Sequence, residues 1–357
     1  MTKPYRVAIV GCGRIAATHA STYRRHPDFE IVASADINAD TLGSFQKSFD
    51  VPAGFADYAK MLVETQPDIV SICTFVGLHW PIFKASVEVG VRGIICEKPM
   101  LNTPAELAQA RALVSRSGVK VVSGHMRRYG AAHLRARELF LGGAIGDPIF
   151  IAGTLEGGEM AEMGAHWIDL IRFFNGDARV EWVMAQTNMH DKRRWDHAVE
   201  DNALLYMQFE NGLKAVYEGG QTVLNGDLYS LLQGSAGSIQ IVQEKALIVS
   251  DKAGVRREDF GNDPPDAWKA YGLEMPDPPW NYKWDILLRE FVAWLEGGEE
   301  PGAGFTNAAT ATEIYLAAYG SAIRREKVEL PLRGADFEWD EWPGEILARQ
   351  AKDGRRS

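Results

Sequence analysis

The first 124 residues alternate short apolar runs with longer segments whose apolar positions have helical spacing. We interpret as strands the runs at residues 7–10, 31–35, 69–73, 94–96 and 119–122. We interpret as helices the segments at residues 15–25, 41–49, 58–64, 81–89 and 104–117. Because strands alternate with helices long enough to connect parallel neighbours, this pattern predicts an α/β domain over residues 1–124 with a parallel sheet.

From residue 125 to residue 357 the pattern changes, and we expect a second domain there. A helix at 131–141 precedes alternating apolar and polar stretches at 149–155, 181–188, 203–209, 213–220 and 239–249. Such alternation is typical of antiparallel strands with one buried face. Asn211-Gly212 favours a hairpin turn between two of these strands, because both residues tolerate positive φ angles. With late helices at 285–295 and 307–324, the sequence predicts an α+β domain with a large open, mainly antiparallel sheet.

Composition narrows the classes of function and of cellular location. The 357 residues are 46% hydrophobic and 24% charged, and the formal net charge of −10 argues against nucleic acids or anionic membranes as partners. No apolar run approaches the ~20 residues that a membrane span needs. The odd number of cysteines, Cys12, Cys73 and Cys96, predicts reduced thiols, and the N-terminus lacks the pattern of a signal peptide. We therefore expect a cytoplasmic protein.

The loop after the first predicted strand is typical of dinucleotide binding. Gly11, Gly13, Arg14 and Ile15 open the first helix, where glycines let the backbone approach a pyrophosphate at the helix N-terminus. Asp36 ends the second strand, where a carboxylate accepts hydrogen bonds from a ribose diol and repels a 2′-phosphate. The sequence thus predicts a Rossmann domain that prefers NAD over NADP. The alternative is a structural glycine turn beside an exposed aspartate.

A lysine follows the fifth predicted strand, in the segment Glu97-Lys98-Pro99. Since the carboxyl ends of parallel strands bind ligands, we expect Lys98 to face the cofactor crevice. The positive charge of an oxidised nicotinamide would favour a neutral amine, which suits Lys98 to proton exchange. The alternative is a surface lysine beside a turn.

A histidine and two carboxylates have helical spacing in the second half of the chain. Glu162, His166 and Asp169 stand at positions i, i+4 and i+7, which would place them on one helix face. A histidine there could accept a hydroxyl proton while a carboxylate orients its ring. The alternative is a solvated helix face. We expect no metal site, because no cysteine or second histidine completes a ligand set.

With these motifs, the chain resembles the Gfo/Idh/MocA family, the glucose–fructose oxidoreductase and inositol dehydrogenase group, over nearly its whole length. The resemblance rests on the glycine loop, Asp36, Cys73-Thr74 and the motifs at residues 97–99, 124–129, 143–148 and 164–169. It implies oxidation of a secondary hydroxyl of a sugar or cyclitol, with Lys98 and His166 as the catalytic pair.

The resemblance also implies roles for further residues. Asp169 would bind a substrate hydroxyl, Arg127 would lie near the substrate pocket, and Thr74 and Glu97 would contact the cofactor. It further implies a homodimer or homotetramer that forms through the open sheet of the second domain.

Two features depart from the family pattern. Glu162 stands where the family often has aspartate, and only residues 155–161 separate the strand before it from the histidine segment. Substrate contacts could come instead from the basic and aromatic run at residues 191–197, which includes Arg194 and Trp195, or from Tyr282. Arginine pairs with carboxylate or sulfonate oxygens, and an aromatic ring packs on a sugar. The alternatives are a solvated loop for the run and a core position for Tyr282.

Three functions are compatible with these residues. The first is an NAD-dependent oxidoreductase that transfers a hydride between the nicotinamide and a secondary hydroxyl of a sugar, sugar acid or cyclitol. The second is an NAD-dependent glycosidase that oxidises, eliminates and re-reduces an anionic glycoside such as a sugar sulfonate. The third is a non-catalytic dinucleotide sensor.

Overall fold

The computed structural model describes residues 4–157, 159–189, 193–194, 197–220, 229–260, 282–333, 344 and 346. These residues belong to two compact units, each described by itself. The first unit takes its residues from Met1–Asn102, Glu106–Met126 and Trp268–Ala309. The second takes them from Thr103–Ala105, Arg127–Ala267 and Thr310–Ser357.

The first unit is built on a six-stranded parallel sheet, as the sequence predicts. The strand order is β3-β2-β1-β4-β5-β6. The strands are β1 (Tyr5–Val10), β2 (Phe29–Ala35), β3 (Ala53–Phe55), β4 (Ile69–Ile72), β5 (Gly93–Cys96) and β6 (Lys120–Ser123). The three-residue strand β3 was not predicted, because its short sequence Ala-Gly-Phe has no apolar alternation.

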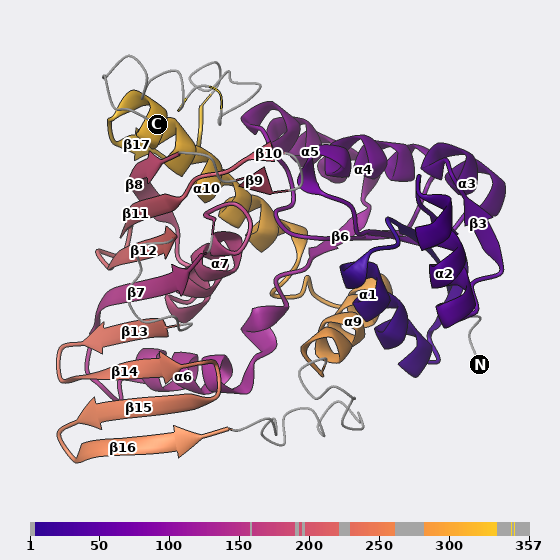
Figure 1. Ribbon diagram of the computed structural model, residues 1–357. Helices are drawn as coiled ribbons and strands as arrows, with labels where there is room; N and C mark the ends of the chain where they lie inside the picture. The colour runs from indigo at the N-terminus through magenta and orange to yellow at the C-terminus, as the bar shows by residue number, and fades with distance from the viewer. Residues whose placement is uncertain are drawn as a thin grey trace. The chain divides into compact units, whose positions relative to one another are not determined.

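Helices cover both faces of this sheet. They are α1 (Arg14–Arg25), α2 (Ala39–Phe49), α3 (Tyr58–Thr65), α4 (His79–Glu88), α5 (Pro104–Ser117) and α9 (Tyr282–Leu295). Figure 1 shows α3, α4 and α5 on one face and α1, α2 and α9 on the other. The side chains of Asn38 and Asp57 accept hydrogen bonds from the first turns of α2 and α3, which fixes where these helices begin.

The position of α9 differs from the expected division at residue 124, because α9 packs in the first unit. Asp285 accepts hydrogen bonds from Arg25 at 2.7 Å and from His26 at 3.1 Å. A Cβ atom at Gly93 of β5 would lie 2.6 Å from the ring of Phe291, so the helix touches the strand closely there. The first unit therefore combines residues from both ends of the chain, and α10 (Phe305–Arg324) begins in it.

The second unit is built on a nine-stranded sheet with the order β16-β15-β14-β13-β7-β12-β11-β8-β17. Its strands are β7 (Pro148–Glu156), β8 (Val180–Asn188), β11 (Asn202–Phe209), β12 (Lys214–Gly220), β13 (Tyr229–Gly234), β14 (Gly237–Val242), β15 (Ala246–Asp251), β16 (Gly254–Asp259) and β17 (Val328–Glu329). Strands β7 and β12 pair in parallel, and the other pairings described in this sheet are antiparallel. The expected hairpin joins β11 to β12, with Gly212 at a φ of 86°.

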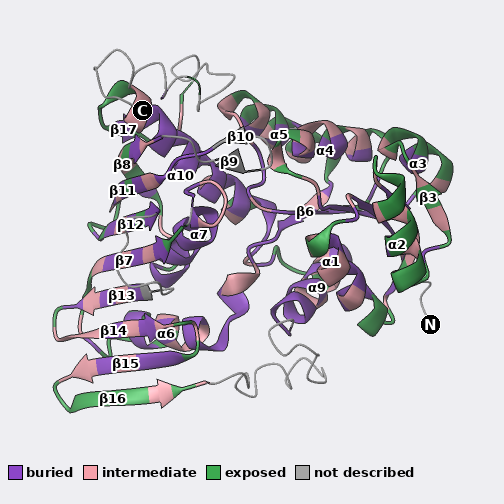
Figure 2. Ribbon diagram, viewed as in Figure 1, coloured by how far each residue is buried: buried purple, intermediate pink, exposed green. Residues whose placement is uncertain are grey.

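One expected strand proves to be two. Residues 239–249 form parts of β14 and β15, which pair antiparallel. The turn between them contains Gln243 and Glu244, both in the left-handed region with φ angles of 51° and 60°. The prediction was wrong because the apolar alternation continues through a turn that has no glycine or asparagine. The edge strand β16, which was not predicted, is largely exposed (Figure 2).

Helices cover one face of the nine-stranded sheet. They are α6 (Ala131–Leu141), α7 (Gly164–Phe174) and the later part of α10 (Figure 1). Helix α7 packs on β7 and β12, and a Cβ atom at Gly153 of β7 would lie 2.3 Å from the Trp167 ring. The close packing of α7 therefore depends on glycine at this position. None of the helices described is both long and apolar enough to cross a membrane.

Candidate active site

The glycine loop of the first unit has the backbone geometry that a dinucleotide site requires. Gly11 has a φ of 86°, and a Cβ atom there would lie 2.7 Å from the carbonyl oxygen of Cys73, so this position requires glycine. The next helix, α1, begins at Arg14 after Gly13, which provides no side-chain cap. The first-turn amides of α1 therefore suit a phosphate group at the helix N-terminus.

Asp36 holds this loop to the end of β2. The Cys12 N–H donates to Asp36 Oδ2 at 2.8 Å, and the Asn38 N–H donates to Oδ1 at 2.8 Å. Each carboxylate oxygen keeps a further lone pair, which could accept a ribose hydroxyl. The exposed Ile37 follows Asp36, so the next side chain offers no cation to a 2′-phosphate.

Thr74 lies beside Gly11, and its buried Oγ1 has no hydrogen-bond partner within the described part of the chain. Buried hydroxyls without a partner are uncommon, so Thr74 fits a polar group of a bound cofactor. His79 holds the backbone of this region: Nε2 lies 3.0 Å from the Thr74 carbonyl oxygen, and Nδ1 lies 3.0 Å from that of Pro99. Burial lowers the pKa of His79. These features fit an NAD site.

A buried hydrogen-bond network holds the side chain of Glu97, the residue before Lys98. The Glu97 Oε1 lies 3.1 Å from His19 Nε2, and His19 Nδ1 lies 3.3 Å from the hydroxyl of Ser71, which contacts Tyr23 at 2.5 Å. Burial opposes ionisation of Glu97, but the hydrogen bond from His19 and the charge of Lys98 hold its pKa below the usual value. The Lys98 N–H donates to Glu97 Oε2 at 3.1 Å. The network therefore orients the backbone at Lys98, and His19 belongs to it.

Helix α7 of the second unit carries His166 and Asp169, which are 5% and 1% exposed. The helix begins at Gly164, so Glu162 lies in the preceding turn. The expectation that Glu162, His166 and Asp169 share one helix face was wrong for Glu162, which precedes the helix. Its physical reason is the turn at residues 161–163, where the Ala161 N–H donates to the Tyr319 hydroxyl at 3.1 Å.

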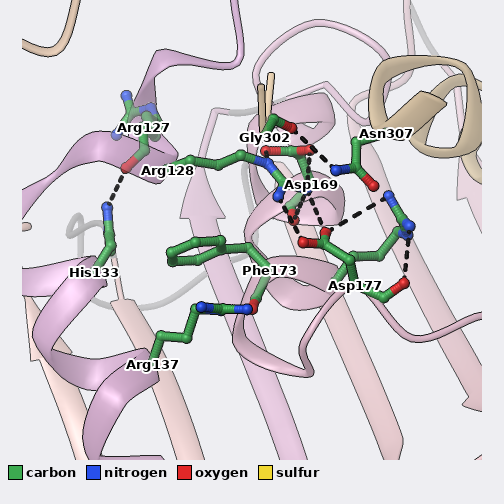
Figure 3. Close-up of polar contacts among 10 residues, drawn as sticks. Arg127, Arg128, His133, Arg137, Asp169, Phe173, Asp177, Gly302 and Asn307 are labelled. Atoms are coloured by element: carbon green, nitrogen blue, oxygen red, sulfur yellow. Dashed lines mark hydrogen bonds and ion pairs between the residues drawn. The ribbon is translucent and has the colours of Figure 1, made fainter. Parts of the chain in front are cut away.

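The carboxylate of Asp169 is bound by Arg128 (Figure 3). Arg128 Nε lies 2.7 Å from Oδ2 and Nη2 lies 2.7 Å from Oδ1, which makes the pair bidentate. The same guanidinium contacts Asp177 at 2.7 and 3.0 Å. Burial lowers the pKa of Arg128, but the two aspartates raise it well above the usual value. Asp169 thus ties α7 to the Met126–Tyr129 turn, and its role as a ligand of the substrate stays a prediction.

Arg127, in the same turn, forms an ion pair with Glu244 and lies 4.9 Å above the ring of Trp167. Its carbonyl oxygen lies 2.8 Å from His133 Nδ1. Burial lowers the pKa of Arg127 to about 10. Contacts from the β14–β15 turn and from α7 therefore hold Arg127 in place.

The remaining candidates are only partly described. The backbone of Arg194 lies in β9 (Arg193–Arg194), which pairs with β10 (His197–Ala198), and Trp195 lies outside the described residues. Tyr282 is the first residue of α9, is 7% exposed and belongs to the first unit. Over the part of the chain that the structure describes, no three histidine, cysteine or carboxylate side chains gather as a metal site would require.

The strand order of the first unit and its glycine loop define a Rossmann fold of the dinucleotide-binding class. A family model described as "Oxidoreductase family, NAD-binding Rossmann fold" matches residues 5–125. A second model, described as "GFO/IDH/MocA C-terminal domain", matches residues 133–240. The chain belongs to the GFO/IDH/MocA family of oxidoreductases.

Relatives with established names are similar over most of the chain. D-apiose dehydrogenase from Paraburkholderia graminis is 26% identical over 92% of this chain and 90% of that protein. Myo-inositol 2-dehydrogenase from Thermotoga maritima is 22% identical over 91% of this chain and 98% of that protein. The solved structure of levoglucosan dehydrogenase with NADH superposes with a TM-score of 0.78 at 21% identity, over 93% of this chain and 100% of that one. The structural likeness shows the fold.

Proposed function

We propose that this protein is an NAD-dependent dehydrogenase acting on a secondary hydroxyl of a sugar, sugar acid or cyclitol. The observation that carries the proposal is the cofactor loop, where Asp36 holds the glycine turn with both carboxylate oxygens and can still accept a ribose diol. The names of the relatives, an apiose dehydrogenase and an inositol dehydrogenase, support a polyhydroxylated substrate.

The residues of the first unit would bind the cofactor. We assign the pyrophosphate to the backbone of Gly11, Gly13, Arg14 and Ile15, the ribose diol to Asp36, and further contacts to Thr74 and Glu97. When bound, NAD supplies the acceptor for a hydride from the substrate carbon. Glu97 keeps the backbone of Lys98 in place, so that the amine can take part in orienting the reacting hydroxyl.

His166 of the second unit would remove the hydroxyl proton, so that negative charge does not accumulate on the substrate oxygen. Glu162 and Arg127 are our candidates for contacts to flanking hydroxyls, with Arg194, Trp195 and Tyr282 as further substrate contacts. Asp169 is a further candidate for a substrate hydroxyl, and its pair with Arg128 would orient the helix that carries His166.

The test is an incubation of the purified protein with NAD and a panel of neutral and anionic sugars, cyclitols and glycosides. NADH absorbance and aglycone release are followed in the same sample. Accumulation of NADH with an intact glycosidic bond supports the dehydrogenase. Good NAD affinity without any turnover over the panel would favour the dinucleotide sensor instead.

Lys98→Ala should abolish turnover while the Kd for NAD changes little, because the cofactor loop does not depend on this side chain. Lys84→Ala is the matched control, since Lys84 is exposed on α4 of the same unit. Equal activity of Lys98→Ala and Lys84→Ala would refute the assignment of Lys98.

A redox-assisted glycosidase is the second candidate. The observation that favours it is the short segment between β7, which ends at Glu156, and α7, which begins at Gly164, because a short loop leaves room for a bulky aglycone. The basic run at residues 191–197 would suit an anionic glycoside. Release of aglycone without net NADH distinguishes this function from the dehydrogenase.

We propose NAD rather than NADP as the cofactor. Asp36→Ser removes the charge that would repel a 2′-phosphate, so it should raise the ratio of kcat/KM with NADP to that with NAD by about tenfold or more. An unchanged ratio would contradict the role of Asp36.

The free thiols of Cys12, Cys73 and Cys96 support a reducing compartment, the cytoplasm, as the location.

We also propose that the open face of the nine-stranded sheet forms a homodimer or homotetramer interface. Met184 and Leu204 are 50% and 49% exposed, and Trp182 stacks on Tyr206 at 5.2 Å on the neighbouring strand. Exposed apolar side chains in neighbouring strands are typical of an interface. Light scattering should give the mass of an oligomer for the wild type and a lower mass for Met184→Lys with Leu204→Lys. A monomeric wild type would overturn this proposal.

A further inference from the structure

A buried polar cluster lies at the start of α7. Glu200, which is 1% exposed, accepts a hydrogen bond from the Met160 N–H at Oε1, at 2.5 Å. The Tyr319 hydroxyl, on α10, donates to the same carboxylate at 3.1 Å and accepts the Ala161 N–H at 3.1 Å. Two consecutive backbone amides before α7 are thus held by two side chains that are distant in the sequence.

The first residue of α7, Gly164, is held by contacts with β12 and with the segment before the helix. A Cβ atom at Gly164 would lie 2.7 Å from the hydroxyl oxygen of Tyr217, so the helix start rests directly on β12. The Gly164 N–H also donates to the Glu159 carbonyl oxygen at 2.8 Å. His166 follows two residues later, so any displacement of this start moves His166 with it.

We propose that Glu200 and Tyr319 are positioning residues for His166, acting through residues 160–161 and the start of α7. This inference rests on the proposed catalytic role of His166. Glu200 and Tyr319 are fully enclosed and bind the backbone of this segment, so they act on the geometry of α7 and not on the reacting atoms.

The strength of this contact depends on the proton of Glu200. Burial raises the pKa of Glu200 to about 7, although the Met160 amide and the Tyr319 hydroxyl oppose this rise. The titratable groups facing it are Glu159 before α7, Tyr217 on β12 and Tyr319 on α10, and burial raises the pKa of both tyrosines. An ionised carboxylate accepts from both donors, whereas a protonated one must itself donate. The raised pKa means that burial penalises the ionised carboxylate more than these hydrogen bonds stabilise it, so ionisation favours opening of the cluster. The amides of residues 160–161 should therefore be held less tightly above pH 7 than below it.

The experiment measures amide hydrogen exchange of residues 159–166 by mass spectrometry, as protection factors that remove the intrinsic dependence on pH. In the wild type, protection of the Met160 and Ala161 amides should fall between pH 6 and pH 8. Tyr319→Phe should lower protection of the Ala161 amide about five- to tenfold, because it removes the oxygen that accepts this N–H. Glu200→Gln keeps an acceptor oxygen and should remove the pH dependence of protection while keeping the segment ordered.

The control variants are Tyr58→Phe on α3 and Glu210→Gln in the β11–β12 turn, which lie outside this cluster. Kinetics are then compared: Tyr319→Phe should lower kcat severalfold with an unchanged Kd for NAD. Protection that is independent of pH in the wild type and unchanged in Tyr319→Phe would overturn the inference. If protection changes but kcat of Tyr319→Phe equals that of Tyr58→Phe, the contact exists but does not position His166, and the inference is refuted while the proposed role of His166 stands.

Discussion

Arg128 binds Asp169 through two hydrogen bonds of 2.7 Å, and both side chains are almost completely buried. The pair joins the turn after β6 to the middle of α7, across 41 residues of sequence. Because the carboxylate is held at both oxygens, the rotation of α7 about its own axis is fixed near His166.

Arg128→Met should lower the free energy of unfolding by about 3–5 kcal/mol, because it leaves the buried carboxylate of Asp169 without its partner. Urea unfolding followed by circular dichroism measures this loss. The matched control is Arg257→Met, which breaks an exposed ion pair of equal length, Arg257 to Asp259 at 2.7 Å, and should hardly change stability. Equal losses of unfolding free energy in the two variants would show that burial of the Arg128 pair adds nothing to its contribution to stability.

The two loop glycines should respond differently to alanine. Gly11→Ala should destabilise the first unit, because its φ of 86° is unfavourable for alanine and the new methyl group would meet Cys73. Gly13→Ala adds a methyl group with no neighbour within 4 Å at a φ of −78°, so it should fold normally. Weaker NAD binding by Gly13→Ala, measured by calorimetry, would then report close approach of the cofactor. Identical melting temperatures for the two variants would contradict the described loop.

Glu200 should make stability fall with rising pH. Its pKa is about 7 in the folded protein and 4.5 as a free side chain, so the folded state binds the proton more tightly. This contribution to stability is full below pH 4.5 and is lost as pH rises through 7. The loss amounts to roughly 3 kcal/mol at about 1.4 kcal/mol per pKa unit.

The measurement is the difference in free energy of unfolding between wild type and Glu200→Gln at pH 5 and at pH 8. Relative to Glu200→Gln, the wild type should be less stable at pH 8 than at pH 5, because the glutamine cannot ionise. Glu210→Gln, in the turn after β11, provides the baseline. A pH-independent difference between wild type and Glu200→Gln would rule out this titration.

The three cysteines should be unreactive in the native protein. Burial raises the pKa of Cys12 to about 12 and those of Cys73 and Cys96 well above the usual value. Since the thiolate is the nucleophile, alkylation by iodoacetamide at pH 8 should be more than about a hundredfold slower than in guanidinium. Mass spectrometry of the labelled sites gives the rates. Fast labelling of Cys12 alone would show that the glycine loop opens.

Local patterns were sufficient to predict five of the six strands of the first sheet. The strands were predicted because apolar runs bounded by turns recur with helical segments between them. The hairpin at Asn211-Gly212 was predicted from the tolerance of these residues for positive φ, which Gly212 adopts. The merged β14 and β15 show the limit of this reasoning. The turn at Gln243 and Glu244 carries no turn-forming residue, and Glu244 is instead paired with Arg127, which lies far away in the sequence.

The candidate site residues also divide into those that a local motif predicts and those that contacts distant in the sequence hold in place. Gly11 and Asp36 follow a local motif, and their geometry agrees with it. The partners that hold the site were not predictable, because Arg128 and Glu200 act on residues 41 and 40 positions away. In the sequence, these residues are an arginine in a basic pair and a glutamate beside an aspartate, which are ordinary surface patterns. Only the folded chain shows that they are buried against specific partners.

The placement of α9 has a consequence for how this chain is made. Tyr5 on the first strand contacts Glu296, which lies 291 residues later in the sequence. Arg25 contacts Asp285, which lies 260 residues later. On a ribosome that adds ~5–20 residues per second, the nascent first sheet stays without α9 for tens of seconds. During that time Gly93 and its neighbours expose apolar surface that Phe291 later covers. The NAD-binding half of this protein is thus synthesised first but completed late.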